Sequence, residues 1–360
     1  MAERSARVAV IGGDGIGPEV VDACIPAVAA AAGHDGLHIS WERLPYSADH
    51  YLETGETLPD SAFDHLANAV DAILLGALGD SRVPGNEHAR DILLGLRFRL
   101  DLYINFRPCR LLHPDLCPLK PGPDGARAID FVIFRENTEG SYLGRGSSKH
   151  EGTPDEEQIA EEVHTARKVE RLLRAAFTWA KEHGRSLVTV SDKSNAIPAH
   201  RIWRRIAQRV AADFDGVALE FRYVDALAME LVREPERFQV IAANNLFGDI
   251  LSDLGAQLVG GLGVAASANL HPGRPGLFEP VHGSAPPLVG TGRANPFGAI
   301  MTGVLMLEQL RAPRGAAALE RAVRAAIDRG ATTPDLGGSL TTAQVAEAVT
   351  EDVRAVAETA

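Results

Sequence analysis

The fold class is decided by the stretch Val8-Ala9-Val10-Ile11-Gly12-Gly13-Asp14-Gly15-Ile16-Gly17-Pro18-Glu19. Its apolar start predicts a buried strand, and its glycines predict a tight turn. Pro18 and Glu19 are typical of the first turn of a helix, because proline lacks an N–H and the acid faces the positive end of the helix dipole. Further apolar runs lie at 72–75, 131–134, 187–190 and 240–242, helical patterns lie at 161–181 and 202–212, and one or two solvent-facing helices are expected after Ala316. This alternation predicts an α/β fold with a substantially parallel sheet.

The glycine-rich turn is not a dinucleotide fingerprint. That fingerprint has the form G-x-G-x-x-G, and here Pro18 stands in the place of the third glycine. An ordinary turn between a strand and a helix explains the segment equally well. The turn therefore does not predict a Rossmann nucleotide site.

Composition excludes several classes of partner. The 360 residues include 48 acidic and 36 basic ones, which gives a formal net charge of -12, and no long basic run is present. Nucleic-acid binding needs clustered lysine and arginine, so we expect no nucleic-acid partner. Apolar runs such as 72–78 are too short to cross a bilayer, so no membrane is expected either. Three cysteines without metal-site spacing, Cys24, Cys109 and Cys117, are typical of a reduced, cytoplasmic protein.

Two acids in the segment 245–254 form a candidate metal site. Asp249 and Asp253 are four residues apart, so a helix places both carboxylates on one face. Like charges beside apolar neighbours such as Ile250 and Leu251 need a compensating cation. Oxygen ligands favour Mg²⁺ or Mn²⁺. A solvated acidic face is the alternative explanation.

Three arginines are candidates for binding an anionic substrate. They are Arg97, Arg107 and Arg135, and Arg135 directly follows the strand-like run 131–134, where α/β folds place their sites. A guanidinium group binds a carboxylate through two parallel hydrogen bonds, so three of them suit a polyanion. Surface pairing with the excess of acids is the alternative.

Several further residues have both a chemical and an ordinary explanation. Lys193 follows the run 187–190 and can act as an acid or base if its pKa is lowered, or it can be a surface lysine. Tyr142 can donate a proton or simply pack. The polar segment His282-Gly283-Ser284-Ala285-Pro286, followed by Asn295, can wrap a nucleotide or only connect two elements.

Together and in this order, these motifs resemble those of the β-decarboxylating dehydrogenase family, which includes isocitrate and isopropylmalate dehydrogenases. The matching segments are 13–19, 96–97, 107–108, 135–140, 192–195, 245–253, 279–286 and 333–339. The resemblance extends over about residues 8–345. It implies a metal-dependent, nicotinamide-linked enzyme that oxidises and decarboxylates a 2-hydroxy dicarboxylic acid.

The resemblance also implies the architecture. It is an isopropylmalate dehydrogenase-like two-domain α/β fold with a shared central mixed sheet, not a Rossmann fold. Residues 1–102 and 261–360 would form the first, cofactor-binding domain. Residues 103–260 would form the second domain, which carries the metal and substrate sites and dimerises through a clasp near 142–155. Each active site of the homodimer would then combine two subunits.

Roles follow from the resemblance residue by residue. The substrate carboxylates are expected to bind Arg97, Arg107 and Arg135. The metal is expected to bind Asp249 and Asp253, together with Asp225 of the partner subunit, which also contacts the substrate. Lys193 of the partner subunit would remove the hydroxyl proton, and Tyr142 would protonate the enol carbon after CO₂ leaves. The nucleotide would contact His282, Gly283, Ser284, Ala285, Pro286 and Asn295.

The residues before Arg97 favour one substrate. Asp91 and Leu93 stand where isocitrate enzymes carry a serine and an asparagine for the third carboxylate. Leu93 and Leu94 match the leucine pair that receives the isopropyl group in isopropylmalate enzymes. We therefore expect oxidation of 3-isopropylmalate to 4-methyl-2-oxopentanoate and CO₂. The alternatives are another 3-substituted malate, tartrate or D-malate, or a non-catalytic paralogous subunit.

One position departs from the family pattern. NAD-using relatives carry an aspartate directly after the His-Gly-Ser-Ala-Pro motif, and NADP-using relatives carry Lys-Tyr there. This chain has Pro287-Leu288 instead, with Arg293 nearby in the sequence. We expect NAD as the cofactor, with NADP left open.

Overall fold

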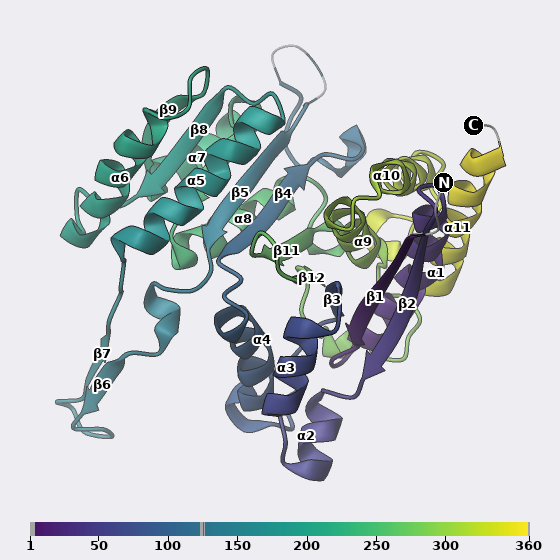
Figure 1. Ribbon diagram of the computed structural model, residues 1–360, viewed down its shortest axis with the longest axis horizontal. Coiled ribbons are helices and arrows are strands. Elements are labelled where there is room, and N and C mark those ends of the chain that lie inside the picture. The colour runs from purple at the N-terminus through teal and green to yellow at the C-terminus, as the bar shows by residue number, and fades with distance from the viewer. Residues whose placement is uncertain (1–3, 123–124, 126, 359–360) are drawn as a thin grey trace. The chain divides into compact units, whose positions relative to one another are not determined.

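The computed structural model describes residues 4–122, 125 and 127–358, and these form two compact α/β units (Figure 1). The first unit contains the residues up to Leu102, the segment Leu111–Arg127 and the residues from Ala256 onward. The second contains Tyr103–Arg110 and Ala128–Gly255. Both ends of the chain therefore belong to the first unit, and the second is inserted between them.

The first unit is built on a sheet with the strand order β2-β1-β3-β12-β11. Its strands are β1 (Arg4–Ile11), β2 (Leu37–Leu44), β3 (Ala72–Leu75), β11 (Ala266–Leu270) and β12 (Gly276–Pro280). Its helices are α1 (Gly17–Gly33), α2 (Ala48–Thr54), α3 (Asp60–Asn68), α4 (Glu87–Arg99), α9 (Phe297–Gln309), α10 (Pro313–Asp328) and α11 (Thr342–Glu358). All neighbouring strands are parallel except β11 and β12. β3 is buried along its whole length, which is typical of a strand covered on both faces.

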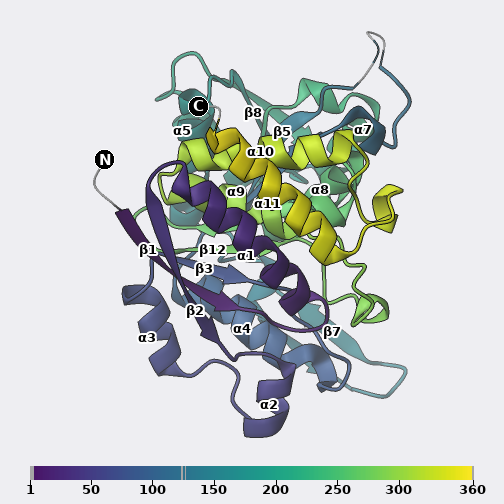
Figure 2. The same ribbon diagram turned by 90° about the vertical axis from the view of Figure 1, so that its right-hand side faces the viewer.

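Different helices cover the two faces of this sheet. On one face, Phe63 and Leu66 of α3 and Ile92 and Leu96 of α4 pack with side chains of β1, β3 and β12. On the other, α1 and α9 contact the strands, and α10 and α11 pack against α1 (Figure 2). The core of this unit thus lies in layers above and below the sheet.

The second unit has the strand order β4-β5-β10-β8-β9. Its strands are β4 (Ile104–Arg110), β5 (Asp130–Glu136), β8 (Leu187–Asp192), β9 (Ala218–Tyr223) and β10 (Val240–Ala243), and its helices are α5 (Ala166–Glu182), α6 (Arg201–Ala211), α7 (Val224–Arg233) and the start of α8 (Asn245–Leu258). β4 and β5 are antiparallel, and the other pairs are parallel. Two exposed antiparallel strands, β6 (Gly146–Lys149) and β7 (Glu157–Ala160), extend away from this sheet (Figure 1).

The α/β class predicted from sequence is confirmed, and two of the predicted elements differ from the structure. The helix expected at 161–181 begins only at Ala166, because Thr165 accepts a hydrogen bond from the backbone N–H of Lys168 and so caps it. The C-terminal helices do not simply face solvent, since α10 and α11 each bury one side, with Leu319 and Val349 fully covered. No helix in the described part of the chain is long and apolar enough to cross a bilayer.

The segment Leu111–Arg127 belongs to the first unit, although residues 103–260 were expected to form one domain. The guanidinium group of Arg324 on α10 donates hydrogen bonds to the carbonyl oxygens of Leu111 (3.3 Å) and Leu112 (2.8 Å). His113 lies 3.6 Å from the carboxylate of Asp328. These contacts tie the segment to α10, so the chain crosses between units more often than expected.

Candidate active site

The start of α8 brings two carboxylates close to β5. Asn244 caps this helix by accepting a hydrogen bond from the N–H of Phe247 (2.8 Å). Gly248 permits close packing, because a Cβ atom there would lie 2.6 Å from the Cβ of Arg135. Asp249 therefore sits directly beside the C-terminal end of β5, and Asp253 lies one turn further along the helix.

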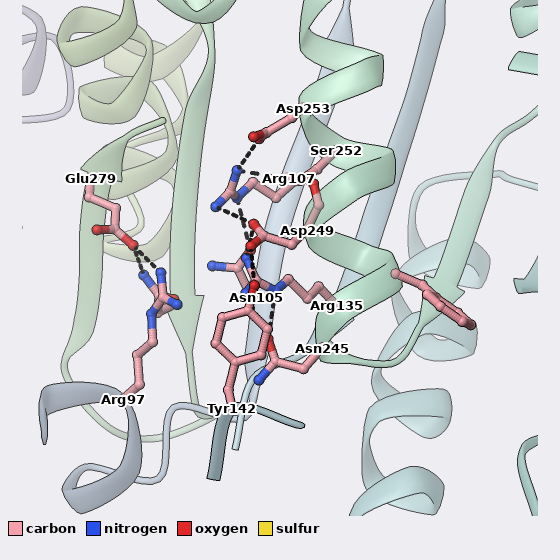
Figure 3. Close-up of polar contacts among 12 residues, drawn as sticks. Arg97, Asn105, Arg107, Arg135, Tyr142, Asn245, Asp249, Ser252, Asp253 and Glu279 are labelled. Carbon is pink, nitrogen blue, oxygen red and sulfur yellow. Dashed lines mark hydrogen bonds and ion pairs between the residues drawn. The ribbon is translucent and has the colours of Figure 1, made fainter. Parts of the chain in front are cut away.

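Arg135 is the centre of this cluster and is only 1% exposed. Its Nε and Nη2 atoms donate to the side-chain oxygen of Asn245 (2.9 and 2.7 Å), and Nη1 donates to Asp249 (Figure 3). The amide nitrogen of Asn245 donates to the carbonyl oxygen of Glu139 (3.0 Å), which fixes the orientation of the amide. The hydroxyl of Tyr142 donates to the other oxygen of Asp249 (2.7 Å). An arginine, a phenol and a carboxylate thus meet at one point.

Arg107 approaches the same acids from β4. Its Nε donates to Asn105 (2.9 Å), and its Nη1 lies 3.4 Å from Asp253 (Figure 3). Its Nη2 is 3.9 Å from Asp249. Burial and the neighbouring Asp249 carboxylate nevertheless raise the pKa of Asp253 above its ordinary value. The two arginines therefore do not fully compensate this acid pair, and paired aspartate oxygens are suitable ligands for a hard divalent cation.

Lys193 and Asp225 form a separate pair in the same unit. Lys193 follows β8, and Asp225 lies in the first turn of α7. The Nζ of Lys193 is 2.6 Å from the Asp225 carboxylate, and the hydrogen bond between them lowers the pKa of Asp225. The Asp225 side chain is 64% exposed. The structure thus joins the two residues that the family resemblance assigns to a partner's active site.

Arg97 and the two leucines before it belong to the first unit. Arg97 is buried on α4 and pairs with Glu279 (2.8 Å; Figure 3). Glu279 also accepts a hydrogen bond from Asn269 (2.8 Å). The Nε of Arg97 has no hydrogen-bond partner among the described residues. Leu93 and Leu94 are half-buried one turn earlier, and Leu93 packs against the core cluster of α3 and α4.

The predicted nucleotide loop lies against the glycine-rich turn. The N–H of Ile16 donates to the carbonyl oxygen of Ser284 (3.0 Å). Gly15 has a φ of +61°, and a Cβ there would lie 2.1 Å from that same oxygen. The glycine is needed because the two backbones touch at this point. The turn therefore supports the loop 282–286, although it lacks the dinucleotide fingerprint.

Two predicted nucleotide residues have different surroundings within the first unit. His282 is largely buried, which lowers its pKa, and its Nε2 has no hydrogen-bond partner among the described residues. A buried donor or acceptor of this kind fits a ligand that supplies the missing partner. Asn295 instead uses its side chain inside the protein, because it accepts from the N–H of Phe297 (2.9 Å) and donates to Asp335 (2.9 Å). The remaining predicted residues, Gly283, Ala285 and Pro286, form the rest of the loop.

A second group of possible metal ligands was not predicted from sequence. It consists of Glu162, His164 and His200, whose ligand atoms all lie within 4.8 Å of one another. Only the Glu-x-His spacing of the first two residues was visible in the sequence. His200 joins them because η4 (Pro198–His200), which follows β8, brings it next to the segment before α5.

Comparison with known proteins identifies the family of this chain. Residues 7–353 match the model of the isocitrate/isopropylmalate dehydrogenase family. The chain is 42% identical to the 3-isopropylmalate dehydrogenase of Beutenbergia cavernae, over 94% of this chain and 98% of that protein. It is 40% identical to a probable tartrate dehydrogenase/decarboxylase of Bacillus subtilis, over 98% and 99%. The crystal structure of isocitrate dehydrogenase from Methylococcus capsulatus matches with a TM-score of 0.87 and 36% identity, over 97% and 99%. The predicted fold and resemblance are confirmed.

We expect Gly248→Ala to lower the free energy of unfolding by about 1–3 kcal/mol, because an added methyl group forces α8 away from β5. The displacement also moves the Asp249 carboxylate out of the position that it shares with Asp253 as an expected metal ligand, so the affinity for Mn²⁺ should fall as well. Urea unfolding and calorimetric Mn²⁺ titration measure the two effects. Gly33→Ala on α1 is the matched control, because nothing lies within 4 Å of its added Cβ. If Gly248→Ala has the stability and the Mn²⁺ affinity of the parental protein, the result would contradict the close contact between Gly248 on α8 and Arg135 on β5.

Proposed function

Because the chain belongs to the isocitrate/isopropylmalate dehydrogenase family, whose members oxidise and decarboxylate hydroxy acids, we propose that its substrate is 3-isopropylmalate. The products are 4-methyl-2-oxopentanoate, CO₂ and NADH. The observation that carries the proposal is the cluster in which Arg107 and Arg135 meet Asp249, Asp253 and Tyr142. It combines cations for substrate carboxylates, carboxylates for a metal ion, and a phenol for proton transfer.

The charged groups of this cluster form two sets: the arginines bind the substrate, and the aspartates bind the metal ion. Arg107 and Arg135 bind the substrate carboxylates through paired hydrogen bonds, and the family resemblance assigns the same role to Arg97. Asp249 and Asp253, with Asp225 of the partner subunit, hold Mg²⁺ or Mn²⁺. The bound cation supplies a Lewis acid for the carbonyl oxygen of the oxidised substrate.

Two side chains of the protein carry out the proton transfers. Lys193 of the partner subunit accepts the hydroxyl proton, and NAD, when bound, would supply the acceptor for the hydride at C2. Tyr142, whose hydroxyl already contacts Asp249, protonates the carbon that CO₂ leaves. One proton is taken up and one is released, so the reaction consumes substrate and NAD and yields the oxo acid, CO₂ and NADH without a net proton.

The choice of substrate rests on Leu93 and Leu94, which offer apolar side chains where a third carboxylate would need polar ones. A second candidate is tartrate or D-malate, and the relative from Bacillus subtilis supports it by its name. A malate with a different substituent at C3 also fits an apolar pocket. These candidates differ only in the group at C3, so a parallel assay separates them.

We expect the purified protein with Mn²⁺ to reduce NAD fastest with 3-isopropylmalate, when isocitrate, D-malate and tartrate are supplied in parallel. Absorbance of the reduced nicotinamide measures turnover. Asp249→Asn should lower turnover at least about a thousandfold, an estimate scaled from the loss of an electrostatic or acid–base group. Faster turnover of isocitrate would contradict the role of the leucines. Inactivity with all four, while Mn²⁺ still binds, would point to another 3-substituted malate or to a non-catalytic subunit.

Pro287 offers a direct test of cofactor choice. An aspartate at this position would accept hydrogen bonds from the ribose hydroxyls of NAD and repel the 2′-phosphate of NADP. Since a hydrogen bond to a charged group contributes about 1.5–3 kcal/mol, Pro287→Asp should lower the KM for NAD about tenfold or more. Its control, Pro287→Ala, removes the ring without adding the carboxylate and should leave the KM near the parental value. An equal gain with NADP would contradict ribose recognition at this position.

The proposed enzyme is a homodimer, because Asp225 and Lys193 act in the site of the partner subunit. Large apolar side chains are exposed on the helices that would meet: Leu246 and Ile250 on α8, and Met229 and Val232 on α7. We infer that these exposed side chains are covered by the other subunit. The exposed strands β6 and β7 lie in and beside the stretch 142–155 expected to form a clasp.

We expect Ile250→Glu, at a position 56% exposed on α8, to convert the dimer into a monomer and to abolish turnover. A buried, unpaired charge is costly at an apolar interface, and a monomer lacks the groups donated by its partner. Light scattering measures the mass, and nicotinamide reduction measures turnover. Leu52→Glu on α2, where the leucine is 49% exposed, is the control and should remain a dimer. An active monomer of Ile250→Glu would contradict shared sites.

The cysteines support a reducing, cytoplasmic location. All three are free, and Cys24 and Cys109 are buried. Burial raises the pKa of each of these two thiols to about 12, so both remain protonated and unreactive at neutral pH.

A further inference from the structure

Glu162 is the centre of a polar network next to the predicted catalytic lysine. Its carboxylate lies 2.9 Å from Nε2 of His200 and 3.2 Å from Nε2 of His164. It also accepts a hydrogen bond from the side-chain amide of Asn244 (2.9 Å). His200 and Asn244 are almost completely buried.

The hydrogen bonds of the two imidazole rings assign their tautomers. The backbone N–H of Lys193 donates to Nδ1 of His200 (3.1 Å), and the indole N–H of Trp203 donates to Nδ1 of His164 (3.4 Å). A neutral ring whose Nδ1 accepts must carry its hydrogen on Nε2. The His200 ring therefore donates its Nε2–H to Glu162, whereas Nε2 of His164 lies within 3.2 Å of the same carboxylate without the geometry of a hydrogen bond. Neither ring offers Glu162 a lone pair. A metal ion on Nε2 of His200 would need a hydrogen on Nδ1, where it would face the N–H of Lys193.

The group is thus a hydrogen-bonded network with an ionised carboxylate at its centre. The adjacent imidazoles of His164 and His200 lower the pKa of Glu162 to about 2. The carboxylate consequently remains a fixed acceptor throughout the working pH range. Through Asn244, which caps α8, and through His200, it connects the start of α8 with the backbone of Lys193.

We propose that His200, oriented by Glu162, is a positioning residue for Lys193. The inference deepens the proposed function and rests on it, because it concerns the lysine that removes the hydroxyl proton there. His200 fixes the backbone from which the Lys193 side chain extends toward Asp225 (2.6 Å). Positioning is important for catalysis, since a displacement of about 1 Å at a reacting group can lower turnover about a hundredfold.

Two amide variants of His200 separate its two hydrogen bonds. His200→Asn places an oxygen near the position of Nδ1, so it keeps the acceptor for the Lys193 N–H and loses the donor to Glu162. His200→Gln reaches the position of Nε2, so it keeps the donor and loses the acceptor. We expect kcat to fall about tenfold or more in His200→Gln, relative to the parent. In His200→Asn we expect a kcat at least about fivefold higher than that of His200→Gln. The KM of the substrate should stay near the parental value in both, because His200 does not contact substrate.

The control and a second measurement exclude a merely structural effect. His164→Asn removes one contact of Glu162 without touching Lys193, so it should lower Tm as the His200 variants do and leave kcat within about twofold. The chain has only five lysines, so ¹³C-methylation of the full chain gives few NMR signals, and Lys193→Arg assigns one of them. That signal should move in His200→Gln and stay near its parental position in His200→Asn.

Equal kcat values in the two His200 variants, or kcat values that follow Tm across all three variants, would overturn the proposal. So would calorimetric binding of Zn²⁺ to the parent that disappears in Glu162→Gln, because it would require free Nε2 lone pairs. If the parent turns over none of the substrates while the Lys193 signal behaves as expected, the positioning stands and the proposed function fails.

Discussion

The second unit depends on the contacts that the buried guanidinium group of Arg135 makes with α8. A charge that is 1% exposed needs a compensating partner, and Asp249 and Asn245 supply it from the first turns of α8. This requirement draws the helix onto β5, and Gly248 is the residue that lets it approach. Once α8 is held there, Asp253 and Tyr142 have defined neighbours as well. The position of Asp249 and Asp253 is therefore a consequence of the contacts that compensate the buried charge of Arg135.

The order of the strands brings the other functional side chains to one edge of the sheet. β5, β10 and β8 are neighbouring parallel strands, and their C-terminal ends lead to Arg135, Asn244 and Lys193. The carboxyl ends of parallel strands are where α/β proteins place their sites. The Glu162 network acts on two of these three ends, at Asn244 and at Lys193. Residues distant in sequence are thus aligned by the sheet before any ligand binds.

Local patterns were predictable from sequence, and contacts between distant segments were not. The buried strand at 72–75 has the predicted bounds, and Asp249 and Asp253 lie on one helix as their spacing predicts. The network of Glu162 and His200 joins residues 38 positions apart, so no local spacing indicates it. The side chain of Asn295 bonds to Asp335, which only the folded chain brings near. Catalytic roles came from the family resemblance, because a lone lysine or tyrosine has no distinctive pattern.

The interruption of the first unit has a consequence for synthesis on the ribosome. β3 ends at Leu75, yet its neighbour β12 begins only at Gly276, about two hundred residues later. Until that strand has emerged, one edge of a wholly apolar strand lacks its partner, which is the condition under which nascent chains aggregate. Most of the second unit comes from one continuous stretch and can fold meanwhile. The nascent protein can thus complete its smaller, inserted unit first, and the larger unit that contains both termini must wait for the last third of the chain.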